Sequence, residues 1–275
     1  MLNIFCHLRS ISVAVLLLLL GSYPAHAAAT ARIAVTLPPL AGLVSMLDQQ
    51  AEVICLLPAG ADPHHFQLTP RKIEALARTD LLIRTSFDDG GWPLPPQHRH
   101  SLNLWSDIDH GWLSPQAVRG VLPKIADALI KLQPVQSKQI AASLQAALQQ
   151  TDDIAQAWRT AIAKAGLSGV LMQHPSWRRL MQEMDVPVLA VLESVHHGHE
   201  HGPHKLEHAL KTLKQHPDAW LLADAAHSSR ALDWLAAHSQ TKTQRITLDA
   251  LGACGESWPA LMRRNIAQIS AVAQP

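Results

Sequence analysis

The centre of the chain reads PVQSKQIAASLQAALQQTDDIAQAWRTAIAKAG, from Pro134 to Gly166. This segment has no further proline and no earlier glycine, so nothing in it breaks a helix. Its apolar side chains are spaced by four residues in two runs: Ile140, Leu144 and Leu148, then Ile154, Trp158 and Ile162. The pattern predicts one amphipathic helix of about 30 residues, roughly 45 Å long. No heptad is sustained, which disfavours a coiled coil. A helix of this length can cross from one lobe of a protein to another.

Short apolar runs rich in β-branched residues lie on both sides of this helix and alternate with helical segments. Such alternation predicts parallel sheets covered by helices. We therefore expect an α/β protein with an N-terminal lobe (28–132), a linking helix (133–165) and a C-terminal lobe (166–275). The predicted strands are 31–37, 52–57, 80–85 and 101–105 in the first lobe, and 169–173, 186–192, 219–224 and 245–249 in the second.

A further helix is expected just before the linking helix, in the segment SPQAVRGVLPKIADALIKL. Ser114 is a good N-cap, and Pro115 suits the first helical turn. Pro123 falls inside the apolar pattern, where a proline removes one backbone donor. We expect it to kink or interrupt the helix.

The first 27 residues have the features of a secretory signal peptide. The apolar run ISVAVLLLLL is followed by AHA, a small-residue cleavage signal that ends at Ala27. No cysteine follows the run closely enough to carry a lipid anchor, and no other stretch is long and apolar enough to span a bilayer. We expect a protein that is exported to a bacterial periplasm and is not lipid-anchored.

Two cysteines, Cys55 and Cys254, remain after cleavage of such a peptide. An oxidising compartment permits a disulfide and makes unpaired thiols a liability. We predict that the two are bonded, although Cys55 is expected in a strand of the first lobe and Cys254 in a late loop of the second. Such a bond must cross between the lobes, and a sequence does not give the distance that decides it.

Charge and composition argue against nucleic acid as a partner and point to a metal ion. The 23 basic and 22 acidic residues nearly cancel, which gives no basic surface for nucleic acid. The chain has 17 histidines but only one tyrosine. An excess of histidine is a compositional sign of metal handling.

Four residues with metal-binding side chains lie in loops or at strand ends: His64, His110, His174 and Asp224. In parallel α/β sheets, residues just beyond the carboxyl ends of strands line the ligand crevice. His64, His174 and Asp224 fit this rule, and His110 lies in a loop just before a helix. Each has an ordinary alternative, since a strand-end histidine is often only hydrogen-bonded and Asp224 could cap the next helix.

The segments around these residues resemble one family, the zinc and manganese solute-binding proteins of bacterial ABC importers. The similar segments are GADPHHFQLTP, HGWLSP, QHPSW followed by MDVPVLAV, and LLADAAHSSRALDWLA. The resemblance implies two four-stranded lobes joined by a rigid helix, with a metal site in the cleft between them. It places the ligands at His64, His110, His174 and Asp224. It also implies a monomeric binding protein rather than an enzyme, with the membrane permease of an importer as partner and a periplasmic zinc chaperone as a second candidate.

Zinc is the expected metal. Three imidazoles and a carboxylate suit tetrahedral Zn²⁺, whereas Mn²⁺ prefers more oxygen ligands. Manganese members of the family usually have glutamate where this chain has His174. Release of the ion on acidification is expected. The family motif selects His64, which leaves its neighbour His65 as a rim residue or an alternative ligand. The family commonly has an aspartate directly after the third ligand, and this chain has Pro175 there. We expect this difference to affect the surroundings of the site more than its ligands.

A second group of histidines lies in ESVHHGHEHGPHKLEHAL. Zinc members of the family often have a histidine-rich segment, usually in the first lobe. The segment here is interpreted as an auxiliary zinc site, or alternatively as a solvated loop. Its members are His196, His197, His199, His201, His204 and His208.

Three alternative functions remain: a manganese-binding homologue, a periplasmic zinc chaperone or buffer that uses the histidine-rich loop, and a zinc hydrolase. A hydrolase needs an open coordination position for water, and a fourth protein ligand such as Asp224 would close it.

Overall fold

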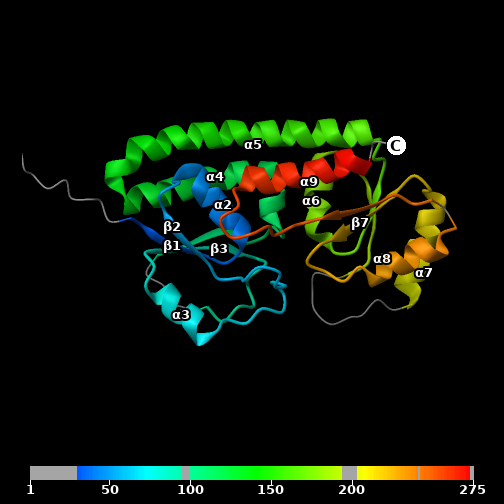
Figure 1. Cartoon of the computed structure of the whole chain (residues 1–275), viewed down its shortest axis with the longest axis horizontal. Helices are drawn as coiled ribbons and strands as arrows, with labels where there is room; N and C mark the ends of the chain where they lie inside the picture. The colour runs from blue at the N-terminus through cyan, green and yellow to red at the C-terminus, as the bar shows by residue number, and fades with distance from the viewer. Residues whose placement is uncertain (1–29, 95–99, 194–202, 241, 273–275) are drawn as a thin grey trace, which may run out of the picture.

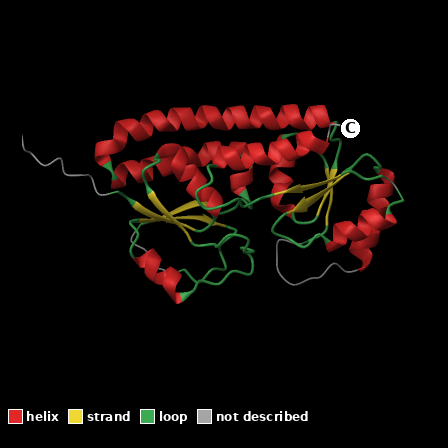
Figure 2. Ribbon diagram, viewed as in Figure 1, coloured by secondary structure: helices red, strands yellow, loops and turns green. Residues whose placement is uncertain are grey.

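The computed structural model describes residues 30–94, 100–193, 203–240 and 242–272. Two α/β lobes lie side by side, and one long helix extends across both of them (Figure 1). Figure 2 shows that the strands of each lobe form a sheet of their own, with helices packed around it. Within the described ranges, no helix combines the length and the apolarity needed to cross a membrane. The predicted signal peptide lies outside these ranges.

The N-terminal lobe is built on a four-stranded parallel sheet in the order β2-β1-β3-β4. Its central strands are almost fully buried, because helices or loops cover both faces. The strands are β1 (Arg32–Val35), β2 (Glu52–Cys55), β3 (Leu81–Ser86) and β4 (Ser101–Trp105).

The C-terminal lobe repeats this arrangement in the order β6-β5-β7-β8, again with all strands parallel. Central β5 and β7 are wholly buried. The predicted two-lobe fold, with four parallel strands in each sheet, is confirmed. The strands are β5 (Val170–Met172), β6 (Val188–Val191), β7 (Trp220–Asp224) and β8 (Arg245–Leu248).

The long helix α5 (Ser137–Ala165) begins after a short 3₁₀ turn and ends at Gly166, whose positive φ of 63° closes its C-terminus. Helices from both lobes pack beneath it, and α4, α2 and α9 supply most of these contacts. The helices and 3₁₀ turns are α2 (Pro38–Leu47), α3 (Pro70–Ala77), η1 (Gly111–Leu113), α4 (Pro115–Leu132), η2 (Pro134–Gln136), η3 (Pro175–Trp177), α6 (Arg178–Glu183), α7 (Pro203–Gln215), α8 (Arg230–His238) and α9 (Trp258–Val272).

Helix α4 is capped as predicted, since the Ser114 hydroxyl accepts a hydrogen bond from the backbone N–H of Ala117. α4 continues through Pro123, so the predicted interruption is wrong, while the kink given as its alternative stays a prediction. Pro123 is exposed, and the buried face on either side of it is formed by residues such as Leu122 and Ile125. The proline thus lies on the solvent side of α4, and the core covers the opposite face.

The two lobes share one apolar core and are joined by buried hydrogen bonds. The Trp112 indole of η1 donates to the carbonyl of Ala250, just after β8, at 2.7 Å. The Trp258 indole at the start of α9 donates back to the carbonyl of Trp112 at 2.6 Å. Both indoles are almost fully buried. These reciprocal bonds couple the segment after His110 to the C-terminal lobe.

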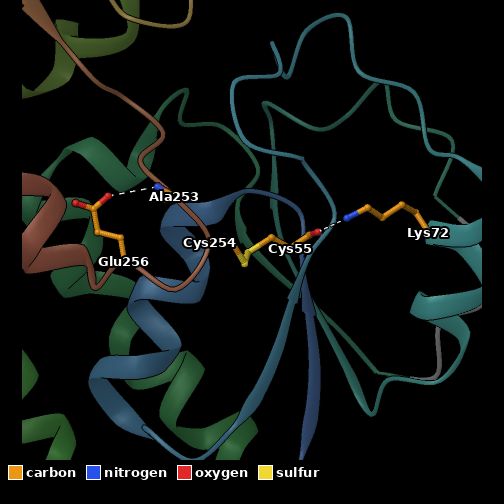
Figure 3. Close-up of a disulfide and its surroundings, with 5 residues drawn as sticks. All are labelled: Cys55, Lys72, Ala253, Cys254 and Glu256. Atoms are coloured by element: carbon orange, nitrogen blue, oxygen red, sulfur yellow. Dashed lines mark hydrogen bonds between the residues drawn. A yellow bond between two sulfur atoms is a disulfide. The ribbon is translucent and has the colours of Figure 1, made fainter.

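The chain returns to the first lobe after β8. Gly42 of α2 approaches this returning segment so closely that a Cβ there would lie 2.5 Å from the backbone N of Trp258. The predicted disulfide is confirmed: Cys55, at the end of β2, is bonded to Cys254, and their Cα atoms are 6.0 Å apart (Figure 3). In the same view, the Lys72 ammonium donates to the carbonyl of Cys55 at 2.6 Å. The bond therefore ties the end of β2 to the loop before α9.

Candidate metal centre

Residues that can bind or support a metal follow the carboxyl ends of strands in both sheets. In each lobe these ends face the other lobe, so the loops that follow them meet in the cleft. The residues, with the strand that each one follows, are His64 (β2), Asp88 (β3), His110 (β4), His174 (β5), Glu193 (β6) and His227 (β7).

Three histidines form the group of described residues that could hold one metal ion. Nitrogen atoms of His64, His174 and His227 all lie within 4.8 Å of one another. The Nε2 atoms of His64 and His174 come from opposite lobes and are 3.3 Å apart. Two nitrogens bound to tetrahedral zinc at about 2.0–2.1 Å are separated by roughly 3.3–3.4 Å. This pair is already spaced as one edge of a zinc tetrahedron.

His110 lies beside this group, with its ring centroid 5.2 Å from that of His174 and 6.2 Å from that of His64. Its backbone is left-handed (φ 48°) and its side chain is buried. Its Nδ1 lies 3.7 Å from carboxylate oxygens of both Asp88 and Asp109. An imidazole with its Nδ1 edge against carboxylates leaves its Nε2 edge for another partner, as in many metal sites.

The position of His110 depends on a tight turn after β3. Asp88 accepts a hydrogen bond from the backbone N–H of His110 at 3.0 Å. The adjacent Asp89 is fully buried and accepts from the Arg84 guanidinium at 2.7 and 3.0 Å and from two backbone N–H groups. Burial raises the pKa of Asp88, while the neighbouring His110 imidazole lowers the pKa of Asp109. The turn thus presents a carboxylate to His110 from within the first lobe.

Asp224 is buried close to the histidines, but it lies outside the three-histidine group. One carboxylate oxygen accepts from the Ser176 hydroxyl at 2.5 Å, and the other accepts from the backbone N–H of Ala226 at 2.9 Å. The backbone N–H of His227 donates to the Asp224 carbonyl at 3.1 Å. Asp224 therefore organises the turn that carries His227.

The cleft disfavours the charged form of two of these imidazoles, those of His64 and His174. Burial and the neighbouring imidazoles of His174 and His110 together lower the pKa of His64 from 6.5 to about 4. Burial also lowers the pKa of His174. A neutral imidazole has a lone pair available for a metal ion, so the cleft holds these side chains in the binding form.

Two residues of the site, His227 and Glu193, are absent from the sequence prediction. Each lies two or three residues after the end of a strand, as His174 does, so the strand-end rule points to both. His227 was hidden by the choice of Asp224 three residues earlier. Glu193 was hidden by the histidine-rich segment that begins after it.

The remaining predicted histidines lie apart from the centre or outside the described residues. The side chain of His65 is 77% exposed and lies 3.8 Å from Asp62, at the rim. His204 and His208 are exposed on α7, and His204 faces Glu207 at 3.8 Å. Four members of the predicted auxiliary site fall outside the described residues: His196, His197, His199 and His201.

Comparison with known proteins shows which family the chain belongs to. Residues 33–272 match the family model described as zinc-uptake complex component A, periplasmic. The chain belongs to this zinc-uptake family. Members of the family are metal-binding periplasmic components of ABC importers, and that coarse assignment holds for this chain. A protein of Thermotoga maritima is 25% identical over 250 residues, which cover 86% of this chain and 91% of the relative.

Solved structures share the family fold. A crystal structure of ZnuA is 19% identical with a TM-score of 0.73, covering 89% of this chain and 98% of that one. The solute-binding protein FpvC of Pseudomonas aeruginosa, in complex with Mn²⁺, is 20% identical with a TM-score of 0.74 and the same coverages. A Cd-bound periplasmic metal-binding protein of Candidatus Liberibacter asiaticus is 14% identical with a TM-score of 0.75, covering 89% and 100%. At these identities the likeness establishes the fold, and the choice of metal depends on the site itself.

Proposed function

We propose that this protein captures zinc in the periplasm and delivers it to the membrane permease of an ABC importer. The ion is bound in the cleft by the imidazoles of His64, His110, His174 and His227. The observation that carries the proposal is the 3.3 Å contact between the Nε2 atoms of His64 and His174, which come from opposite lobes. Two neutral imidazoles from separate lobes at the spacing of a zinc tetrahedron favour a shared ion.

The donor set supports zinc over manganese. Imidazole nitrogen suits zinc, copper, nickel and iron, whereas manganese favours carboxylate, carbonyl and water oxygen. His227 adds nitrogen to a set that the sequence predicted to include the Asp224 carboxylate. In this proposal Asp224 supports the turn that carries His227, with its two oxygens accepting from the Ser176 hydroxyl and from the backbone N–H of Ala226.

A transport role is also favoured over hydrolysis. Hydrolytic zinc sites keep one position open for water and have three protein ligands. Four imidazoles would fill the tetrahedron and leave no position for an attacking hydroxide. The zinc-uptake family membership supports the same choice.

The decisive experiment is a competition titration of the metal-free protein with Zn²⁺, Mn²⁺ and Ni²⁺ against a chelator of known affinity. We expect one tight zinc equivalent, with manganese bound far more weakly. Nickel is included because an FpvC structure contains Ni²⁺. A protein that binds manganese more tightly than zinc would contradict the proposal.

Variants separate the two possible ligand sets. His227→Ala should reduce zinc affinity strongly, whereas Asp224→Asn should have the smaller effect of a weakened turn. His216→Ala is the matched control, because this exposed histidine directly follows α7 and lies outside both the three-histidine group and the predicted auxiliary site. If Asp224→Asn abolishes tight binding while His227→Ala leaves it unchanged, the carboxylate is the fourth ligand and the all-imidazole site is wrong.

A further inference from the structure

Glu193 lies against two of the proposed ligands at once. One of its carboxylate oxygens, Oε2, is 3.5 Å from Nδ1 of His174 and also 3.5 Å from Nδ1 of His227. The other oxygen, Oε1, accepts a hydrogen bond from the Gln173 side chain. The Glu193 backbone N–H donates to the carbonyl of Gln173 at 2.8 Å. The carboxylate is therefore held in place and directs one oxygen at two imidazoles.

The two imidazoles are arranged as a matched pair. The rings of His174 and His227 are stacked, with centroids 4.0 Å apart and planes inclined by 8°. In each ring the Nδ1 edge faces Glu193, so the Nε2 edge points elsewhere. For His174 that edge faces the first lobe, because its Nε2 is 3.3 Å from Nε2 of His64.

We propose that Glu193 is a positioning residue that holds both His174 and His227 with the proton on Nδ1, and so commits both Nε2 atoms to the same metal ion. This inference rests on the proposed zinc site and deepens it. A neutral imidazole has one N–H and one lone pair, and the partner of the N–H fixes which nitrogen can bind metal. A carboxylate accepts hydrogen bonds and donates none when ionised, so it selects the Nδ1–H form of each ring.

The charge of Glu193 suits this role. Its carboxylate lies against the Nδ1 atoms of both rings, beside a site that receives a divalent cation. It compensates part of that charge without occupying a coordination position.

The shared carboxylate also links two of the proposed ligands within one lobe. His174 and His227 both belong to the C-terminal lobe, and Glu193 orients them together before any ion arrives. The pair thus forms half of the tetrahedron on one lobe, and His64 and His110 complete it from the other. Two nitrogen ligands that are oriented in advance favour zinc over manganese, because manganese prefers oxygen ligands.

The test begins with the metal-free wild-type protein, labelled with ¹⁵N in its histidines. Two-bond ¹H–¹⁵N correlation spectra at neutral pH distinguish an imidazole protonated on Nδ1 from one protonated on Nε2. We expect His174 and His227 to be Nδ1–H, with each ring assigned from the signal lost in its own alanine variant. Finding either ring protonated on Nε2 overturns the inference. This result requires no metal and no variant of Glu193.

Glu193→Gln then tests the cause. The amide keeps the size of the side chain but can donate as well as accept, so both rings should lose their uniform Nδ1–H form. Zinc affinity should fall by about 10–100-fold, the range for removing the partner of a ligand histidine. Glu183→Gln is the matched control, because this half-buried glutamate contacts Ser114 and Gln116 across the lobes and no histidine of the site.

The outcomes separate this inference from the proposed function. A wild-type protein with the expected protonation that binds no zinc contradicts the proposed function and leaves the role of Glu193 in the metal-free site. A wild-type protein that binds zinc tightly, with unchanged ring protonation and affinity in Glu193→Gln, contradicts the inference alone. Loss of affinity without a change in ring protonation also contradicts it, because Glu193 would then act as a ligand or a general structural support.

Discussion

Replacing His64 should remove a defined part of the pH dependence of stability in the metal-free protein. The pKa of His64 is lowered from 6.5 to about 4 by burial and by two neighbouring imidazoles. Between these values the unfolded chain binds the proton and the folded chain does not. Stability is therefore full above the unfolded pKa and is lost as the pH falls from about 6.5 towards about 4.

The two pKa values give the magnitude. At pH 7 an unfolded histidine is mostly neutral, so the difference between the two states is small. At pH 5 the unfolded histidine is almost fully charged while His64 remains neutral in the cleft. The linkage relation converts this difference into about 2 kcal/mol of stability lost between pH 7 and pH 5. Asp109, Glu193 and Asp249 have lowered pKa values, so their contributions are lost mainly at lower pH.

The assay is denaturant unfolding of chelator-treated protein at pH 7 and pH 5, for wild type and His64→Gln. The glutamine variant cannot titrate, so its stability should fall by about 2 kcal/mol less than that of the wild type over this interval. A ring-proton NMR titration of wild type should place the midpoint of His64 near pH 4. Equal pH dependence in the two proteins, or a midpoint near 6.5, would refute the reasoning.

Three further predictions concern the scaffold around the site. Replacing Cys55 and Cys254 together with serine should destabilise the protein by roughly 3–5 kcal/mol, because the bond closes a very long loop; equal denaturation midpoints would exclude a stabilising role. Gly42→Ala should lower the melting temperature, because the added Cβ would meet the backbone of Trp258; an unchanged midpoint would mean that α2 can shift freely. Asp89→Ala should lower the free energy of unfolding by about 3 kcal/mol, because it leaves a guanidinium and two backbone N–H groups without their buried acceptor. Zinc affinity should also fall, because the turn that contains Asp89 supports the loop of His110. Normal zinc affinity in a folded Asp89→Ala protein would show that this turn does not position the loop.

The fold was predictable because its signals are local. The unbroken segment after Pro134 predicted the long helix, and the eight apolar runs predicted the strands to within one or two residues of their observed ends. Strand order and the return of the chain to the first lobe depend on distant contacts, such as that between Trp112 and Trp258. The continuity of α4 through Pro123 likewise depends on which face of the helix the core covers. No local pattern encodes these features.

The candidate site was predictable only in part, for a similar reason. His64, His110 and His174 each stand in a recognisable local motif, and the structure brings their rings within about 6 Å of one another. The position of the Asp224 carboxylate depends on Ser176, which is 48 residues away. His227 gains its place from the turn that Asp224 holds. Whether a strand-end side chain reaches the cleft or folds back on its own turn is decided by such partners.

The most direct test of the proposed site is a crystal structure of the zinc-loaded protein, with anomalous diffraction recorded on both sides of the zinc absorption edge. We expect one strong zinc peak in the cleft, with nitrogen ligands from His64, His110, His174 and His227 at about 2.0–2.1 Å. We also expect Glu193 behind two of those rings, without contact to the ion. A peak ligated by the Asp224 or Glu193 carboxylate in place of His227, or no peak between the lobes, would contradict it.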